Sequence, residues 1–372
     1  MRSAILYLAA AAAVVAPAQA TPQAPPPVRY FETVCGALGA IEDACGMAQA
    51  AAELLSPTYE NDKRGRGIAR LEHLGYAAEY IAAGGGLFRD TTDVFLAARR
   101  GSDRLYIVVT GTESTRDWFE NLKAKSYTTL WRDGYYYTPP AHAGFRSGVL
   151  NVLGAVLKRN EFDETPLTCE ADGSAREGAS RLTAFLCRSR VQSSPSSPVS
   201  VVLIGHSRGA AIATLVAPAF AGYEIKLDGE RADVARQAHW PLAFGGLVGF
   251  APPYALYTRT DEQAGMRLPP GAPDQWQVYG RAGILERTIT FYNERDIVPQ
   301  LSLGLGRQLG HRFRITDTSK IEYMGYGSPN TVSFIEAHAS AGYCHDLLLA
   351  FGREDRDNLY CDDRTYSETG AK

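Results

Sequence analysis

The sequence predicts an α/β protein with a mostly parallel central sheet that helices cover on both faces. Short apolar runs typical of buried strands alternate with stretches of helical periodicity, and no internal repeat interrupts them. A β-branched run at 199–204 also passes through a glycine-flanked turn into an Ala-rich helical run at 210–216. Strands joined by such helical crossovers form parallel sheets that are buried on both faces.

Local patterns predict the other elements of this fold. Apolar residues at helical spacing indicate helices, and short β-branched or aromatic runs bounded by turn residues indicate strands. Residues 160–198 are polar and rich in Ser, Pro and Glu, which predicts a surface insertion. The expected helices span 34–55, 142–157 and 334–351, and the expected strands span 92–98, 105–109, 247–251 and 288–292.

The first twenty residues have the pattern of a cleaved export signal. Arg2 supplies a positive start, residues 4–15 are apolar and uncharged, and residues 18–20 form a small-x-small cleavage pattern. A membrane anchor is the alternative, but the apolar stretch is too short to span a bilayer and Pro17 interrupts it. We therefore expect export, to a periplasm or to the medium, and no transmembrane segment in the mature chain.

The remaining chain is expected to hold a Pro-rich leader over 21–33 and one domain over 34–372. The net charge of the full sequence, −3, gives no reason to expect nucleic acid as a partner.

Six cysteines fall as three sequence-local pairs after the export signal. An even number in an exported chain favours disulfides, whereas free thiols would suit a reducing compartment. No Cys/His spacing suggests zinc, so we expect no metal site. The expected pairs are Cys35–Cys45, Cys169–Cys187 and Cys344–Cys361.

The glycine-flanked turn reads Gly-His-Ser-Arg-Gly at 205–209 and predicts a catalytic serine. A strand, a tight turn and a helix in this order place Ser207 above a helix N-terminus, whose N–H groups favour developing negative charge. Gly205 and Gly209 are expected where no larger side chain fits. An ordinary strand-to-helix turn is the alternative. We interpret the chain as a serine hydrolase with Ser207 as nucleophile.

A nucleophilic serine requires a base and an orienting carboxylate. Asp296 follows the expected strand at 288–292, and working groups gather at the carboxyl ends of parallel strands. Glu294 is the nearest competitor. Three histidines follow in the order that α/β hydrolases use. His311 lies in a basic stretch and is interpreted as a surface or sheet residue, while the residues alone leave His338 and His345 open.

The developing oxyanion requires two backbone N–H donors. Arg208 follows the nucleophile and is expected to supply one of them. Thr112 is expected to supply the other, because Gly111 lets the chain turn sharply after the strand at 105–109. A plain β-turn is the alternative for this segment.

These motifs together resemble the class 3 lipase family, the fungal triacylglycerol lipase type. The resemblance implies the α/β-hydrolase fold, the triad Ser207, Asp296 and His338, and no cofactor. It favours His338 over His345 because a tyrosine follows five residues later, at Tyr343. The matching motifs read Val-Val-Thr-Gly-Thr at 108–112, Asp-Trp at 117–118, His-Ala-Gly-Phe at 142–145, Gly-His-Ser-Arg-Gly at 205–209 and Asp-Ile-Val-Pro at 296–299.

The resemblance also implies a lid over 113–121, with Trp118 and Phe119 as its apolar face. Two residues beside the oxyanion site depart from the family pattern. Thr110 stands where Arg is usual, and Arg208 where Leu is usual.

The expected function is hydrolysis of carboxylic esters, with acylglycerols as substrate and contact with a lipid interface. An esterase on soluble or feruloyl-type aromatic esters is the rival, because the lid mixes apolar and charged residues. A non-catalytic envelope protein that retains the fold is a second alternative.

Overall fold

The computed structural model describes the backbone in several separate segments. They cover 29–31, 35, 38, 43–83, 92–111, 127–129, 140–156, 169–175, 177–191, 198–221, 225–227, 230–232, 242–252, 279, 283–293, 296, 310–315 and 321–325.

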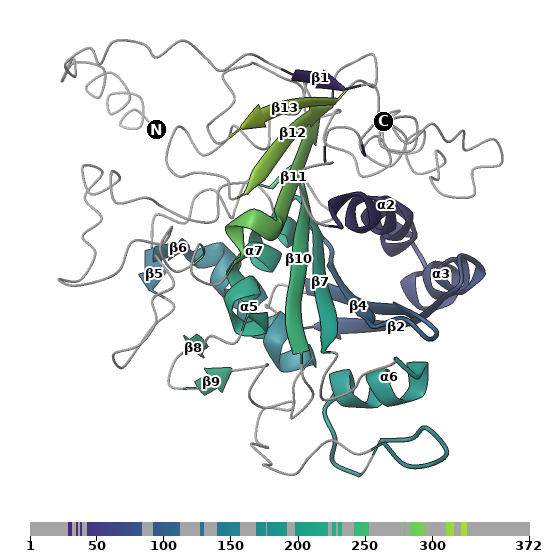
Figure 1. The fold of residues 1–372 in the computed structure, drawn as a ribbon. Helices are drawn as coiled ribbons and strands as arrows, with labels where there is room; N and C mark the ends of the chain where they lie inside the picture. Colours follow the sequence, from purple (N-terminus) through teal and green to yellow (C-terminus); the bar gives the residue numbers. More distant parts are fainter. Residues whose placement is uncertain are drawn as a thin grey trace, which may run out of the picture.

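Across these segments a nine-stranded sheet runs through the centre of the molecule (Figure 1). Its five central strands, β12, β11, β10, β7 and β4, are parallel to one another, and two antiparallel strands flank them on each side. The expected mostly parallel central sheet is therefore confirmed. In spatial order the strands are β1 (Arg29–Phe31), β13 (Ile321–Gly325), β12 (His311–Ile315), β11 (Thr288–Asn293), β10 (Leu242–Phe250), β7 (Val199–His206), β4 (Arg104–Val109), β3 (Thr92–Arg99) and β2 (Tyr76–Ala83).

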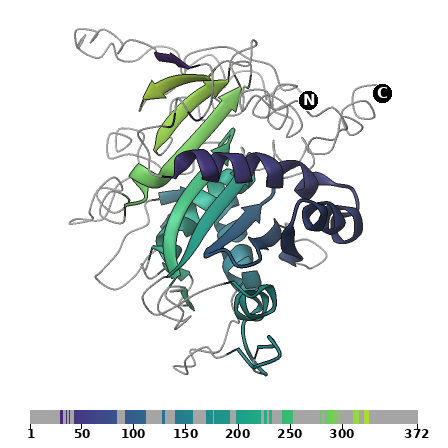
Figure 2. The same ribbon diagram turned by 45° about the vertical axis from the view of Figure 1, so that its right-hand side comes forward.

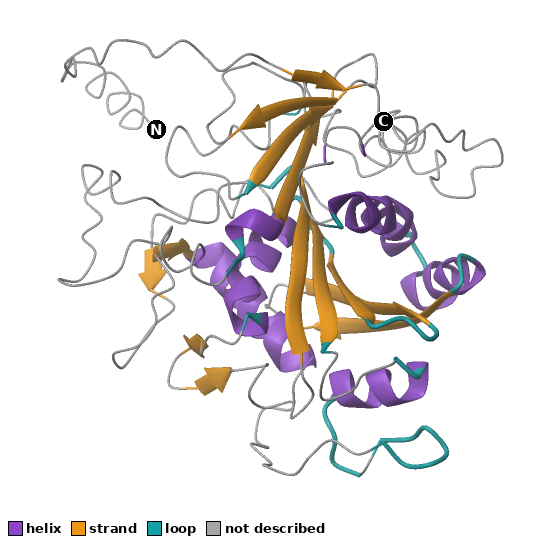
Figure 3. Cartoon of the chain, in the orientation of Figure 1, coloured by secondary structure: helices purple, strands orange, loops and turns teal. Residues whose placement is uncertain are grey.

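Helices cover both faces of the sheet, as expected (Figures 1 and 3). One face packs against α5 (Ala143–Val156), α6 (Arg181–Ser189) and α7 (Arg208–Phe220). The other packs against α2 (Ala44–Leu55) and α3 (Ile68–His73), and Figure 2 shows α2 crossing the sheet. The smaller elements are η1 (Ser56–Tyr59), η2 (Lys63–Gly67), η4 (Leu285–Arg287) and the strand pairs β5 (Tyr127–Thr129) with β6 (Pro140–His142) and β8 (Ile225–Leu227) with β9 (Glu230–Ala232).

The central strand β7 shows why the sheet has two cores. Its side chains alternate between the faces, as strand geometry requires. Val201 and Leu203 join the core under α5, α6 and α7, whereas Val202 and Ile204 join the core under α2. All four are buried. A continuous apolar run is thus what a strand covered on both faces needs.

Two local expectations differ from the structure. Within the helix expected over 34–55, Cys35 and Leu38 are helical, Asp43 interrupts the helix with a left-handed φ of 57°, and α2 begins at Ala44. The segment 160–198 is predicted to be a surface insertion, but its described residues include α6, which packs into the core. Ser180 caps α6 by accepting from the N–H of Thr183, and Phe185 is buried on its apolar face.

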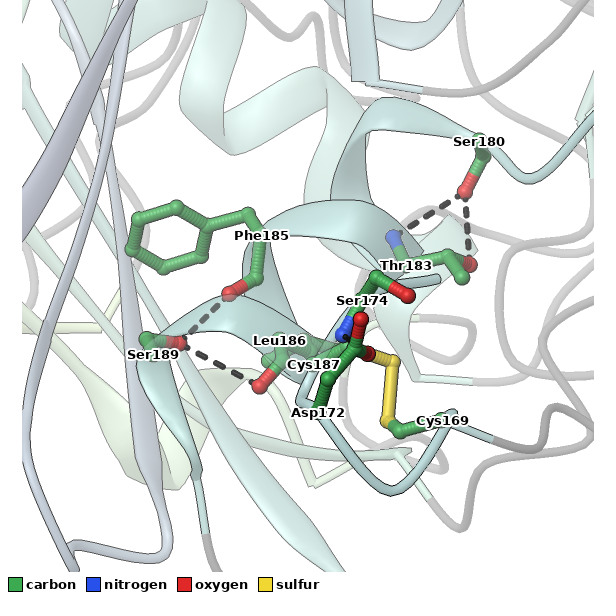
Figure 4. Close-up of a disulfide and its surroundings, with 9 residues drawn as sticks. All are labelled: Cys169, Asp172, Ser174, Ser180, Thr183, Phe185, Leu186, Cys187 and Ser189. Carbon is green, nitrogen blue, oxygen red and sulfur yellow. Dashed lines mark hydrogen bonds between the residues drawn. A yellow bond between two sulfur atoms is a disulfide. The ribbon is translucent and has the colours of Figure 1, made fainter. Parts of the chain in front are cut away.

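Two expected disulfides are present, Cys35–Cys45 and Cys169–Cys187. In the second, Cys187 is buried on α6 and Cys169 lies on the exposed loop before it (Figure 4). A turn closed by the Asp172 carboxylate, which accepts from the N–H of Ser174 at 2.8 Å, shapes that loop. The pair Cys344–Cys361 and the helix expected over 334–351 lie outside the described residues.

Candidate active site

The carboxyl ends of the parallel strands meet at one edge of the sheet. Val109 of β4 pairs with Gly205 of β7, and β7 and β11 are each in register with β10. The segments that leave β4, β7 and β11 therefore start at nearly the same level. These segments carry Gly111, Ser207 and Asp296, which the structure brings to this edge.

Ser207 joins β7 to α7 in a strained backbone conformation. It is 3% exposed and has φ 55° and ψ −129°, a region that side chains other than glycine rarely adopt. Its N–H donates to the carbonyl of Phe250 at 2.8 Å, and its carbonyl accepts from the N–H of Ala210 at 3.0 Å. Such a conformation costs on the order of 1–3 kcal/mol and persists where the surroundings hold it.

The flanking glycines are required by close backbone contacts. A Cβ on Gly205 would lie 2.5 Å from the Cα of Ala210, and one on Gly209 would lie 2.7 Å from the carbonyl carbon of Thr110. Both distances are far below van der Waals contact. The predicted need for small residues on both sides of the serine is therefore confirmed.

Arg208 and Asp296 are both buried charged residues at this edge. Arg208 is the first residue of α7, directly after the serine, and is 2% exposed. Asp296 is fully buried, and its N–H donates to the carbonyl of Asn293 at 3.0 Å, which folds the chain back after β11. β10 separates β7 from β11, so the two strands lie about 10 Å apart.

Gly111 follows the end of β4, with Thr110 between them. Its backbone packs closely against the turn that carries Ser207. A Cβ on Gly111 would lie 3.1 Å from the Cβ of Ser207 and 2.9 Å from the carbonyl oxygen of His206. The N–H of Gly111 donates to the hydroxyl of Tyr59 at 2.8 Å, and that hydroxyl also lies 2.9 Å from Nδ1 of His206. Tyr59 is a member of this site that no local sequence pattern had indicated.

His311 lies away from the serine. It begins β12 in register with Ile289, which places it several residues before the carboxyl ends of the strands. Burial lowers the pKa of His311, and the negative charge of Glu286 opposes that shift. The interpretation of His311 as a sheet residue is confirmed.

The other residues predicted for the site are not among those that the structure describes. They are Thr112, Trp118, Phe119, Glu294, His338 and His345.

The described segments contain neither a metal-binding cluster of side chains nor a membrane-spanning helix. No group of three or more His, Cys, Asp or Glu residues there lies close enough to hold a metal ion. No described helix is both long and apolar enough to cross a membrane.

Comparison with known proteins bears on the fold. No family model and no curated protein matches the sequence. Among solved structures, the triacylglyceride lipase of Rhizomucor miehei aligns with a TM-score of 0.50 and 16% identity, over 84% of this chain and 96% of its own. A lipase from Rhizopus microsporus var. chinensis aligns with a TM-score of 0.48 and 16% identity, over 85% and 92%. Lip2 lipase from Yarrowia lipolytica aligns at 0.45 and 13%, over 87% and 93%.

Of these three structures, the Rhizomucor miehei lipase aligns with the highest TM-score. At 16% identity the likeness shows a shared fold, the α/β-hydrolase fold of a fungal triacylglyceride lipase.

Proposed function

We propose that this protein is an exported serine hydrolase of carboxylic esters that acts on acylglycerols. The observation that carries the proposal is the backbone of Ser207. A buried serine is held at φ 55° and ψ −129° between the central strand and the N-terminus of α7. Strain of this kind in a non-glycine residue is characteristic of functional sites, and a strand–turn–helix context is that of a nucleophile.

In the proposed reaction the Ser207 hydroxyl attacks the ester carbonyl and His338 takes its proton. Asp296 orients the imidazole and stabilises the imidazolium. His338 then protonates the leaving alcohol, and a water molecule activated by the same imidazole hydrolyses the acyl-enzyme. No cofactor takes part in this sequence.

Backbone N–H groups of Thr112 and Arg208 bind the oxyanion in this proposal. The N–H of Gly111 donates to the Tyr59 hydroxyl and is therefore not directed at the oxyanion. This supports Thr112, rather than Gly111, as the second oxyanion donor. The next donor along the loop is then the N–H of Thr112. The N-terminus of α7 adds partial positive charge at the same place.

Export and the acylglycerol substrate rest on further observations. The two disulfides suit an oxidising compartment, in agreement with residues 1–20 as a cleaved signal before the leader at 21–33 and the domain at 34–372. The fold shared with a triacylglyceride lipase supports a lipid ester as substrate. Trp118 and Phe119 would then form the apolar face of a lid that contacts the lipid interface.

The decisive experiment compares the wild-type protein with Ser207→Ala on p-nitrophenyl esters. Turnover should fall by about 10⁶-fold, the loss typical of a removed triad nucleophile. A fluorophosphonate probe should label the wild-type protein at Ser207 and leave the variant unlabelled. Full activity in Ser207→Ala would overturn the proposal.

The substrate class is tested with esters of increasing chain length, below and above their solubility limits. A jump in rate when the substrate aggregates is expected for a lipase. A rate that saturates on soluble esters, with no jump, would instead identify an esterase.

A further inference from the structure

Tyr59 connects two parts of the candidate site that are distant in sequence. It is the last residue of η1, 52 residues before Gly111 and 147 residues before His206. Its hydroxyl accepts from the N–H of Gly111 at 2.8 Å and lies 2.9 Å from Nδ1 of His206. The two rings meet edge to face, with centroids 5.4 Å apart and an angle of 86° between their planes. The ring contact and the hydroxyl contact together define one orientation of the phenol.

The hydroxyl of Tyr59 can both donate and accept hydrogen bonds, so it can connect Gly111 to His206. A tyrosine hydroxyl carries one proton and can also accept hydrogen bonds. When its oxygen accepts from Gly111, its own proton remains to be donated, and Nδ1 of His206, 2.9 Å away, can accept it when the imidazole is the Nε2–H tautomer. The hydroxyl thereby joins the loop after β4 to the residue that precedes Ser207.

The linked residues lie in direct contact with the nucleophile. A Cβ on Gly111 would be 3.1 Å from the Cβ of Ser207, so the loop backbone has no free space there. The peptide group after Gly111 carries the proposed oxyanion donor, the N–H of Thr112. A misplacement of about 1 Å in such a group can cost a factor on the order of 10² in rate.

Thr110, the residue before Gly111, is also fixed in place, in this case by a hydrogen bond to the neighbouring strand β3. The N–H of Thr110 donates to the carbonyl of Asp93 at 3.0 Å, and the Asp93 carboxylate forms an ion pair with Lys63 and accepts from Tyr80. Lys63 begins η2, which follows η1 along the chain. The segment that contains Tyr59 and Lys63 thus contacts Gly111 directly, through Tyr59, and Thr110 indirectly, through Asp93.

We propose that Tyr59 is a positioning residue for the oxyanion site, an inference that rests on the proposed ester-hydrolase function. Its hydroxyl directs the N–H of Gly111 away from the oxyanion and sets the orientation of the following peptide group. Tyr59 itself does not touch the reacting atoms.

The test is Tyr59→Phe, which keeps the ring and removes the hydroxyl. On a soluble p-nitrophenyl ester, kcat should fall by about 10- to 100-fold while KM changes by less than about threefold. The rate of fluorophosphonate labelling should fall in parallel, because the phosphoryl oxygen occupies the oxyanion site. A merely structural role would not change these two quantities together at constant KM.

Tyr279→Phe is the matched control. It also removes a buried hydroxyl, one that donates to the carbonyl of Thr214 at 3.0 Å. It should lower thermal stability and leave kcat at the wild-type value. A kcat of Tyr59→Phe equal to that of Tyr279→Phe would overturn the positioning role.

His206→Leu gives a second route if Tyr59→Phe folds poorly. It removes the acceptor at the other end of the link and should lower kcat in the same direction. Where both single variants fold, the kcat of the double variant should be only a little lower than that of the less active single variant, because both substitutions break the same link. A double variant whose fold-loss in kcat equals the product of the two single losses would contradict the inference. A wild-type kcat in His206→Leu would also contradict it.

The two proposals fail in different ways. Activity retained in Ser207→Ala overturns the function itself. An inactive Ser207→Ala together with a fully active Tyr59→Phe overturns only the role of Tyr59.

Discussion

At the residue scale, the backbone of Ser207 adopts a conformation that is unfavourable for a residue with a Cβ atom. Its φ of 55° with ψ of −129° lies outside the left-handed helical region that Asp43 and Arg190 occupy at helix ends. The contacts of Gly205 and Gly209 leave the turn no space to relax. The protein therefore carries a local cost of about 1–3 kcal/mol where the proposed chemistry needs the hydroxyl.

This strain predicts that Ser207→Gly is more stable than Ser207→Ala by about 1 kcal/mol. Glycine adopts φ 55° without a Cβ clash, and its greater freedom in the unfolded chain offsets part of the gain. Urea unfolding of the two variants measures the difference, and neither should hydrolyse esters. A Ser207→Gly variant less stable than Ser207→Ala would show that the turn is not strained.

At the element scale, α7 contains a proline that interrupts its hydrogen bonding. Pro218 has no N–H, so the carbonyl of Thr214, four residues earlier, receives no donor from it. The hydroxyl of Tyr279, which is fully buried, donates to that carbonyl at 3.0 Å. Burial also raises the pKa of Tyr279, so the hydroxyl keeps its proton for this bond. A side chain from elsewhere in the chain thus replaces the missing helical bond.

We expect Tyr279→Phe to lower the free energy of unfolding by about 1–3 kcal/mol, the cost of leaving a buried carbonyl without a donor. In a Pro218→Ala background the same change should cost less, because the substituted alanine would supply the helical N–H that proline lacks. Urea unfolding of the four proteins in this double-mutant cycle measures the difference. Equal costs in both backgrounds would refute the compensation.

At the scale of the whole molecule, disulfides tie peripheral segments to the core. Cys35–Cys45 lies before and at the start of α2, on one face of the sheet. Cys169–Cys187 fastens an exposed loop to α6, on the other face. Each closes a short loop and so restricts the unfolded chain more than the folded one.

Replacing Cys169 and Cys187 together by alanine should lower the free energy of unfolding by about 3 kcal/mol, as loop closure over 18 residues implies. The comparison is made by urea unfolding against the oxidised parent.

Non-reducing peptide mapping of the parent should also find Cys344 linked to Cys361. A link between either of these and Cys35 would contradict the local pairing.

The sequence alone determined the features that depend on neighbouring residues. The strand–turn–helix around Ser207, the strands β3, β4, β7, β10 and β11, and two disulfide pairs could all be read from local periodicity and spacing. These features follow from side-chain alternation, glycine sterics and short loop closure. Each of these acts within a few residues or within one closed loop.

The tertiary structure alone decided which distant segments meet. It placed β2 and β13 in the sheet, α6 in the core and Asp296 at the same edge as Ser207. It also brought Tyr59 to Gly111 and His206, residues on three separate segments. Periodicity says which face of an element is apolar but not which partner covers it, and a hydrogen bond near 2.8 Å depends on the packed positions of both segments.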